Sequence, residues 1–246
     1  MMYINNGRVI FIIQRIGFPI QKNAAFSAVN IMDWAKWFEE RANKYDTDYQ
    51  RVAYTSEKSM ISRFKICLST IKIKENMNIL DIGSGTGNFL ESVEKEFSNV
   101  NVIGIDIAIN MLIISRQKDT NADFIKADVL KLPLKDGSMD CITCMEVLSN
   151  FNGSEEMALR EIVRVLAPNG QVFLTAIDKN YSGNHIYEES PDDEARLNQK
   201  LYVPEELGDV LRSMDIKNVR ISSFSSVEGI PVPLHQWDKF FIYGIK

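Results

Sequence analysis

Three glycines at alternate positions after an apolar run constrain this chain more strongly than any other feature. Residues 79–90 read ILDIGSGTGNFL, so the apolar run stops at Gly83, Gly85 and Gly87, and an amphipathic pattern follows. This order predicts a strand, a tight turn and a helix. Because glycine tolerates positive φ and carries no Cβ, the turn indicates a ligand that lies against the backbone where the strand becomes the helix.

Acidic residues at the ends of the neighbouring predicted strands support a ligand site at this turn. Residues 102–106 read VIGID and end in Asp106, about 20 residues after the glycines, where such a site needs a carboxylate. The next predicted strand, 122–127, ends before Asp128. Ligands of open parallel sheets bind outside the carboxyl ends of the strands, so Asp81, Asp106 and Asp128 are expected at one crevice.

The order acid-x-Gly-x-Gly-x-Gly, here from Asp81 to Gly87, resembles the first motif of the class I S-adenosylmethionine (SAM) dependent methyltransferases. Nicotinamide- and flavin-binding folds use Gly-x-Gly-x-x-Gly instead, and this chain has Asn88 where their third glycine falls. The segments 130–134 (LKLPL) and 136–140 (DGSMD) follow in the order of the family. The resemblance covers about 80–177 and implies SAM as the cofactor.

The resemblance also implies roles for individual residues. Asp106 is expected to accept both ribose hydroxyls, Ile107 to pack on the adenine, and Asp128 to accept the adenine amino group. Asp81 matches the acid that orders the glycine turn near the methionine part of the cofactor. Taken alone, each aspartate would be interpreted as a helix cap or a solvated loop end. The implied cofactor-binding set is Asp81, Gly83, Ser84, Gly85, Gly87, Asp106, Ile107, Asp128, Val129 and Met145.

Strand and helix patterns alternate regularly from 77 to 177, which predicts an α/β domain with a parallel sheet and helices on both faces. The resemblance implies a Rossmann-like, mostly parallel seven-stranded sheet with an antiparallel last strand. We expect one domain over 33–246, with an N-terminal helical cap at 33–74 and the SAM-binding core at 75–246. The segment 167–170 (APNG) predicts a turn before the strand 171–177.

Residues 1–32 differ from the rest of the chain because they hold Arg8, Arg15 and Lys22 and no acidic residue. Their apolar run is interrupted by Arg15 and is too short to span a bilayer. We interpret them as an extension of uncertain order, with Met32 as a possible working initiator. A transit peptide is the alternative, and a secretory signal is disfavoured because no convincing cleavage site follows.

Charge and cysteine usage bound the partners and the compartment. The formal net charge is −5 and the pI near 5.2, so no global field attracts nucleic acid or an anionic membrane. Three cysteines favour a reducing, cytoplasmic compartment without a disulfide framework. Cys141 and Cys144 are three apart in a predicted strand and face opposite ways, so we predict no metal site there.

The predicted cap contributes aromatic residues. Trp34, Trp37 and Phe38 form the i, i+3, i+4 stripe of a surface helix that packs on something. By analogy with lids in the family, Tyr45, Tyr49 or Arg51 would contact the methionine carboxylate of the cofactor. Packing within the cap is an equally good interpretation of these three residues.

Methyl transfer requires alignment and exclusion of water, and it needs a general base only when the acceptor atom carries a proton. The candidates for such a base or substrate contact are Glu146, Asn150, His185 and His235. Members of the family often have a histidine near the position of Asn150, and this chain has none there. Each histidine has the alternative of being an exposed loop residue.

The acceptor class follows from what the sequence lacks. No Asn/Asp-Pro-Pro-aromatic motif follows the strand 138–145, and no basic stripe is present, which favours a small-molecule acceptor over a macromolecule. Methylation at oxygen, nitrogen or carbon stays open. The alternatives are a non-catalytic SAM-binding or regulatory protein and, disfavoured by the glycine spacing, a nicotinamide oxidoreductase.

Overall fold

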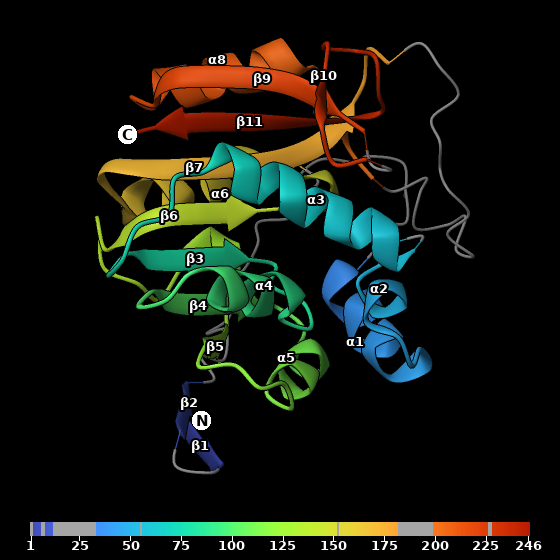
Figure 1. Ribbon diagram of the computed structural model, residues 1–246, viewed down its shortest axis with the longest axis vertical. Helices are drawn as coiled ribbons and strands as arrows, with labels where there is room; N and C mark the ends of the chain where they lie inside the picture. The colour runs from blue at the N-terminus through green and yellow to red at the C-terminus, as the bar shows by residue number, and fades with distance from the viewer. Residues whose placement is uncertain are drawn as a thin grey trace, which may run out of the picture.

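A single mixed sheet organises the part of the chain that the computed structural model describes, which is residues 2–5, 8–11, 33–54, 56–151, 153–181, 199–225 and 228–246. The nine strands of this sheet run in the order β10, β9, β11, β7, β6, β3, β4 and β5, with β8 paired to β7 (Figure 1). The strands are β3 (Asn78–Ile82), β4 (Asn101–Asp106), β5 (Asp123–Lys126), β6 (Met139–Cys144), β7 (Leu166–Asp178), β8 (Leu201–Tyr202), β9 (Lys217–Phe224), β10 (Pro231–Val232) and β11 (Lys239–Ile245).

The predicted mostly parallel sheet with an antiparallel last strand is confirmed. Strands β3 to β7 pair in parallel, and β11 lies antiparallel between β7 and β9. The prediction of seven strands was too low because β8 and β10, of two residues each, add to the sheet. Such short pairings carry too little sequence pattern to be predicted.

Helices cover both faces of the sheet, and α3 crosses in front of it in Figure 1. One face packs against α3 (Glu57–Thr70), α4 (Asn88–Glu96) and α5 (Ile109–Ser115), and the other against α6 (Glu155–Val165) and α8 (Pro204–Ser213). The central strands are apolar on both sides, as parallel strands between two helix layers must be.

The cysteines follow this two-sided packing. Cys141 lies in the same buried cluster as Phe173, on the α3 side, whereas Cys144 lies with Leu174 on the α6 side. The two thiols therefore point to opposite faces, as their spacing predicts. All three cysteines, including Cys67, are free and buried.

The cap lies beyond the carboxyl ends of the parallel strands (Figure 1). It consists of α1 (Trp34–Lys44) and the short α2 (Asp48–Arg51), which lead into α3. Glu39 joins α1 to the core, because its carboxylate accepts the backbone N–H groups of Ile109 at 2.6 Å and Asn110 at 2.9 Å. A carboxylate is well placed there, since the first N–H groups of a helix have no partner within it.

The segment 167–170 does not precede β7 as a separate turn. Met139 pairs with Leu166 and Cys141 pairs with Gln171, so the segment bulges out of a strand that begins at Leu166. Asn169 has a φ of 64°, which gives the bulge its bend.

The N-terminal extension is described only at β1 (Met2–Asn5) and β2 (Arg8–Phe11), which pair antiparallel as a separate two-stranded sheet. Among the helices that the structure describes, none is long and apolar enough to cross a membrane.

Candidate functional site

The glycine turn is ordered by the end of the neighbouring strand. The N–H groups of Gly83 and Ser84 donate to the carbonyl of Ile105 at 2.7 and 3.0 Å. The N–H of Gly85 donates to Asp106 Oδ2 at 2.8 Å, and that of Ala108 donates to Oδ1 at 2.8 Å. Asp106 thereby fixes both the turn after β3 and the start of α5. The role of ordering the turn, which the resemblance gave to Asp81, belongs to Asp106.

Asp81 is bound differently, although it lines the same pocket. It is 4% exposed and accepts a hydrogen bond from Thr143 Oγ1 at 2.7 Å. Burial raises the pKa of Asp81 to about 7 and that of Asp106 to about 6. A bound cation would favour the charged form of both carboxylates and lower these pKa values.

The glycines have distinct tasks. Gly85 has a φ of +52°, and a Cβ added to it would lie 2.6 Å from Val52 Cγ1 of the cap. Gly87 has a φ of +79°, and its added Cβ would lie 2.9 Å from Phe124 Cζ and 3.0 Å from Ser115 Cβ. Gly87 therefore lets α4 pack closely on the core. Gly87 is not among the residues that line the pocket, and its contact with the cofactor stays a prediction.

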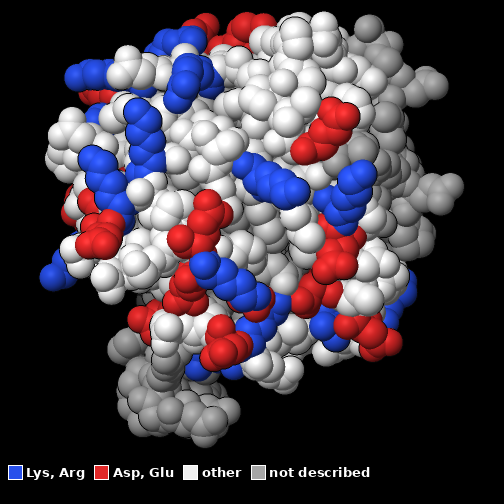
Figure 2. All heavy atoms as spheres, viewed as in Figure 1, with Lys and Arg blue, Asp and Glu red and all other residues white. Residues whose placement is uncertain are grey.

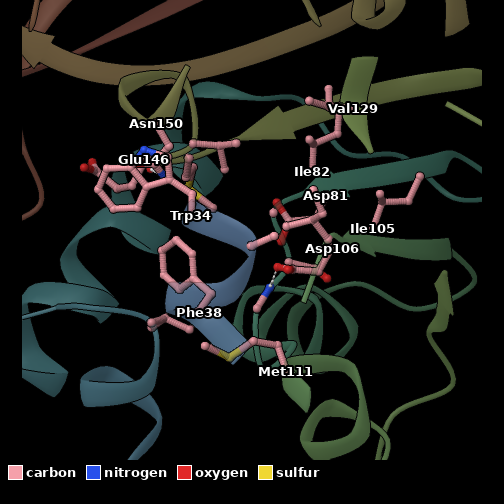
Figure 3. Close-up of a pocket in the computed structure, with 18 of the residues that line it drawn as sticks. Trp34, Phe38, Asp81, Ile82, Ile105, Asp106, Met111, Val129, Glu146 and Asn150 are labelled. Atoms are coloured by element: carbon pink, nitrogen blue, oxygen red, sulfur yellow. Dashed lines mark hydrogen bonds between the residues drawn. The ribbon is translucent and has the colours of Figure 1, made fainter. Parts of the chain in front are cut away.

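A pocket of about 330 Å³ opens at the turn, between the strand ends and the cap (Figure 3). Ligand pockets of this kind range upward from about 300 Å³. The lining includes these predicted cofactor residues: Asp81, Gly83, Ser84, Gly85, Asp106, Ile107, Asp128, Val129 and Met145. Ser84 Oγ is buried and has no hydrogen-bond partner among the described residues, so it is available to a ligand.

Asp81, Asp106 and Asp128 together form what we call the acidic end of the pocket. Asp128 is the last of these three carboxylates along the chain. It precedes η1 (Val129–Lys131), and its Oδ1 accepts the N–H of Leu130 at 3.0 Å. A carboxylate can accept about four hydrogen bonds, so this one bond leaves Asp128 able to accept more. The same holds for Asp106, which accepts two backbone N–H bonds. Three carboxylates with spare acceptor capacity suit the hydroxyl and amino groups of the expected cofactor SAM, and their negative charge suits its sulfonium.

Glu146 lies at the other end of the pocket, after β6, with a φ of 60°. Its carboxylate accepts from Lys239 Nζ at 2.6 Å, from Arg63 Nε at 3.3 Å and from Thr175 Oγ1 at 3.1 Å. Burial alone would raise the pKa of Glu146, but Lys239 and Arg63 outweigh it and lower the pKa to about 2. A carboxylate held this way is a poor general base at neutral pH.

The remaining catalytic candidates separate from one another. Asn150 ends η2 (Leu148–Asn150) and lines the pocket. His235 lies elsewhere: its Nδ1 is 2.7 Å from Asp178 Oδ2, and its Nε2 is 3.3 Å from Glu205 Oε1. The hydrogen bond to Asp178 raises the pKa of His235. His185 lies outside the described residues.

The cap reaches the pocket through other residues than predicted. Arg51 Nε donates to the carbonyl of Tyr45 at 2.7 Å, and Tyr49 packs against the core cluster on the α3 side, so these three residues hold the cap itself. The cap residues that do line the pocket are Asp33, Trp34, Ala35, Phe38, Val52 and Tyr54. Two of these residues, Trp34 and Phe38, belong to the aromatic stripe of α1, which the sequence predicted to pack against another part of the molecule.

Within the described ranges, His, Cys, Asp and Glu side chains form no group of three that could hold a metal ion. The pocket presents carboxylates, backbone groups of the glycine turn and an aromatic cap to a ligand. Together with the strand order, these features define a Rossmann-like α/β protein that binds a nucleoside-type cofactor at the carboxyl ends of its strands.

Comparisons with known proteins narrow this class. Residues 80–174 match the sequence profile of a methyltransferase domain. A demethylmenaquinone methyltransferase of Thermus thermophilus is 37% identical over 103 residues, which is 40% of this chain and 46% of that protein. A ubiquinone/menaquinone biosynthesis C-methyltransferase of Pseudomonas savastanoi is 31% identical over 156 residues, covering 59% of this chain and 58% of that protein. The chain thus spans about half the length of these relatives.

Solved structures share the fold. A SAM-dependent methyltransferase of Thermotoga maritima, described as a possible histamine N-methyltransferase, superposes with a TM-score of 0.64 at 21% identity, covering 86% of this chain and 99% of that one. A putative methyltransferase of Haloferax volcanii, solved with its Trm112 activator, gives a TM-score of 0.66 at 19% identity, covering 85% and 96%. Residues 80–174 are therefore similar to a methyltransferase domain, and the chain shares its fold with solved SAM-dependent methyltransferases.

Proposed function

We propose that this protein transfers a methyl group from SAM to a small, largely apolar acceptor by in-line displacement. The observation that carries the proposal is the turn held by Gly85 N–H and Asp106, beside two further carboxylates, in a pocket covered by an aromatic cap. Bound SAM would supply a methyl group on a sulfonium: an electron pair of the acceptor, a lone pair of oxygen or nitrogen or a π pair of carbon, forms the new bond while the carbon–sulfur bond breaks and its electrons go to sulfur, and a proton on the methylated atom is then released.

The residues of the chain bind and orient rather than react. Asp106 and Asp128 fix the nucleoside through hydroxyl and amino groups, and Asp81 lies where a cationic ligand offsets its burial. Trp34 and Phe38 of α1 cover the pocket and exclude water, which protects the alignment that displacement needs. Glu146 is engaged by two cations, so it is assigned no role as general base.

The acceptor class is supported by the lining and by the surface. Figure 2 shows acidic and basic side chains interspersed on the face viewed, which suits a small neutral molecule better than a polyanion. The relatives are named for demethylmenaquinone and for ubiquinone/menaquinone biosynthesis, so a reduced demethylated quinone is the first acceptor to test. The three buried free cysteines support a reducing, cytoplasmic location.

The test is incubation of the protein with methyl-labelled SAM and reduced demethylmenaquinone, followed by mass spectrometry. Labelled product and S-adenosylhomocysteine are expected to appear together, and Asp106→Ala should abolish both. A protein that binds S-adenosylhomocysteine but labels neither this acceptor nor any small molecule of a cell extract would instead be a non-catalytic SAM-binding protein.

A further inference from the structure

Two residues that line the pocket each carry a buried polar atom with no hydrogen-bond partner among the described residues: Trp34 its indole Nε1 and Asn150 its amide Oδ1. Trp34 is the first residue of α1, and Asn150 is the last residue of η2. Figure 3 draws both with Glu146 to one side of the pocket, with Asp81 and Asp106 to the other. A buried donor and a buried acceptor are therefore left over away from the acidic end.

The orientation of the Asn150 amide is fixed by its neighbour. Its Nδ2 lies 3.5 Å from the carbonyl oxygen of Glu146, which can only accept. Exchanging the amide oxygen and nitrogen would bring two acceptors together, so Oδ1 is the atom turned away from that carbonyl. Nε1 of Trp34 can only donate. The pair thus offers a ligand one acceptor and one donor.

The charges near this end are already compensated. Glu146 is paired with Lys239 and Arg63, and the guanidinium of Arg63 also donates from Nη1 to Ser59 O at 3.0 Å and stacks on the ring of Tyr54, 4.6 Å from its centroid. A charged group on the acceptor would have to compete with these contacts in a buried setting, which is costly.

The walls around the pair are apolar. Tyr54, Met60, Phe64, Met145 and Phe151 all line the pocket. Aromatic and methionine side chains pack well on a flat, apolar molecule. The molecule that fits this end therefore has an apolar body and few polar groups.

We propose that Trp34 and Asn150 select the acceptor by a neutral hydroxyl group, which donates to Asn150 Oδ1 and accepts from Trp34 Nε1. The inference rests on the proposed methyltransferase function and adds the means of acceptor selection. A carboxylate only accepts and an ammonium only donates, so each leaves one of the two buried atoms unsatisfied. The hydroxyl is the handle that orients the acceptor, whichever of its atoms is methylated.

The test uses the protein saturated with S-adenosylhomocysteine and titrated with naphthol, naphthoate or naphthalene. Naphthol is expected to bind at least about tenfold more tightly than the other two, because a site built for a hydroxyl rejects analogues that leave its polar groups unpaired. Naphthol, unlike naphthalene, should shift the NMR resonance of the Trp34 indole N–H downfield.

Trp34→Phe and Asn150→Leu remove the two atoms with little change of shape. Each should reduce the preference for naphthol below about threefold, while the Kd for S-adenosylhomocysteine stays within about threefold of wild type. Trp37→Phe, in the same helix, is the matched control and should keep the preference. Its ring is engaged by the Arg41 guanidinium, 4.5 Å from its centroid.

Three results would overturn the inference. The preference for naphthol could survive in both variants, or naphthol could fail to bind the complex more tightly than naphthoate. The variants could also weaken S-adenosylhomocysteine as much as naphthol, which would assign the two atoms to the cofactor. Failure of wild-type protein to bind S-adenosylhomocysteine at all would instead refute the proposed function itself.

Discussion

The two ends of the pocket hold carboxylates in opposite electrostatic states. At the acidic end, Asp106 is buried with only backbone N–H groups for partners, and its pKa rises to about 6. At the other end, Glu146 is also buried, but Lys239 and Arg63 lower its pKa to about 2. The first carboxylate lacks a counter-ion, and the second has two. A cationic ligand would therefore favour the charged form of the carboxylates at the acidic end, whereas Glu146 already has its counter-ions.

The ends also differ in how the chain builds them. Asp106 binds the backbone of Gly85, 21 residues away, within one strand–turn–helix unit and the strand beside it. Glu146 binds side chains 83 and 93 residues away, on α3 and β11. The acidic end is a product of local motifs, and the end around Glu146 is a product of tertiary packing.

Replacement of the carboxylate at the acidic end should have the largest effect on binding. Asp106→Ala removes the acceptor for Gly85 N–H and the expected partner of the ribose. We expect the Kd for S-adenosylhomocysteine to rise about 100-fold, since hydrogen bonds to charged groups contribute about 1.5–3 kcal/mol each. Calorimetric titration measures this. Asp123→Ala, an exposed carboxylate at the start of β5, is the control and should leave the Kd unchanged.

The glycine turn should tolerate little change. Gly85→Ala combines a φ of +52° with a Cβ only 2.6 Å from Val52 Cγ1. We expect about a tenfold rise in the same Kd, because a left-handed conformation costs a non-glycine residue about 1–2 kcal/mol. Adding Val52→Ala should restore part of the affinity by removing the clash. Full affinity in Gly85→Ala would show that the turn does not hold the ligand as described.

The end around Glu146 should affect stability more than cofactor binding. Glu146→Ala leaves Lys239 and Arg63 without their partner, and we expect the free energy of unfolding to fall by about 2–4 kcal/mol. Urea denaturation measures the change, with the exposed Glu156→Ala as control, expected within about 0.5 kcal/mol of wild type. The Kd for S-adenosylhomocysteine should change less than about threefold. A large loss of affinity without a loss of stability would contradict this division of roles.

The same carboxylate predicts a pH dependence of stability. The folded pKa of Glu146, about 2, lies below the unfolded value. The contribution of Glu146 is therefore present above about pH 4.3, the pKa of an unperturbed glutamate, and is lost as the pH falls toward 2. Denaturation at a series of pH values should show a smaller acid dependence in Glu146→Ala. Equal slopes for variant and wild type would refute the pairing.

The smallest effect is expected at His235, outside the pocket. Asp178 raises the pKa of this partly exposed histidine, so its stabilisation is complete below about pH 6.5, the unfolded value, and is lost as the pH rises through the folded pKa. His235→Gln should lower the Tm by only about 1–3 °C at pH 6. The difference should shrink at pH 9, and activity should be unaffected. Loss of methyltransferase activity in His235→Gln would contradict this and would make His235 a catalytic candidate again.

Local patterns were enough to predict the acidic end. The spacing of Gly83, Gly85 and Asp106 follows from one strand–turn–helix unit and the strand beside it, and the strands from 78 to 144 matched their expected ranges closely. Even there, the resemblance gave Asp81 the role of ordering the turn, whereas the carboxylate that accepts from Gly85 N–H is that of Asp106. Which carboxylate reaches the Gly85 N–H depends on the pairing of β3 with β4, not on sequence order.

The other end could not be predicted because its partners are distant in sequence. Nothing in the sequence near Arg63 or Lys239 indicates that both side chains reach Glu146. The tyrosines of the cap were named as cofactor contacts by analogy, whereas Trp34 and Phe38 are the residues that line the pocket. The aromatic stripe of α1 predicted a buried face. Only the fold shows that this face covers a pocket.

The central claim is that the acidic end binds the nucleoside of SAM, and calorimetric titration of the wild-type protein with S-adenosylhomocysteine and with NAD tests it most directly. The account predicts saturable binding of S-adenosylhomocysteine at one site and none of NAD. Binding of NAD in preference, or of neither molecule, would contradict the assignment of the glycine turn and of Asp106.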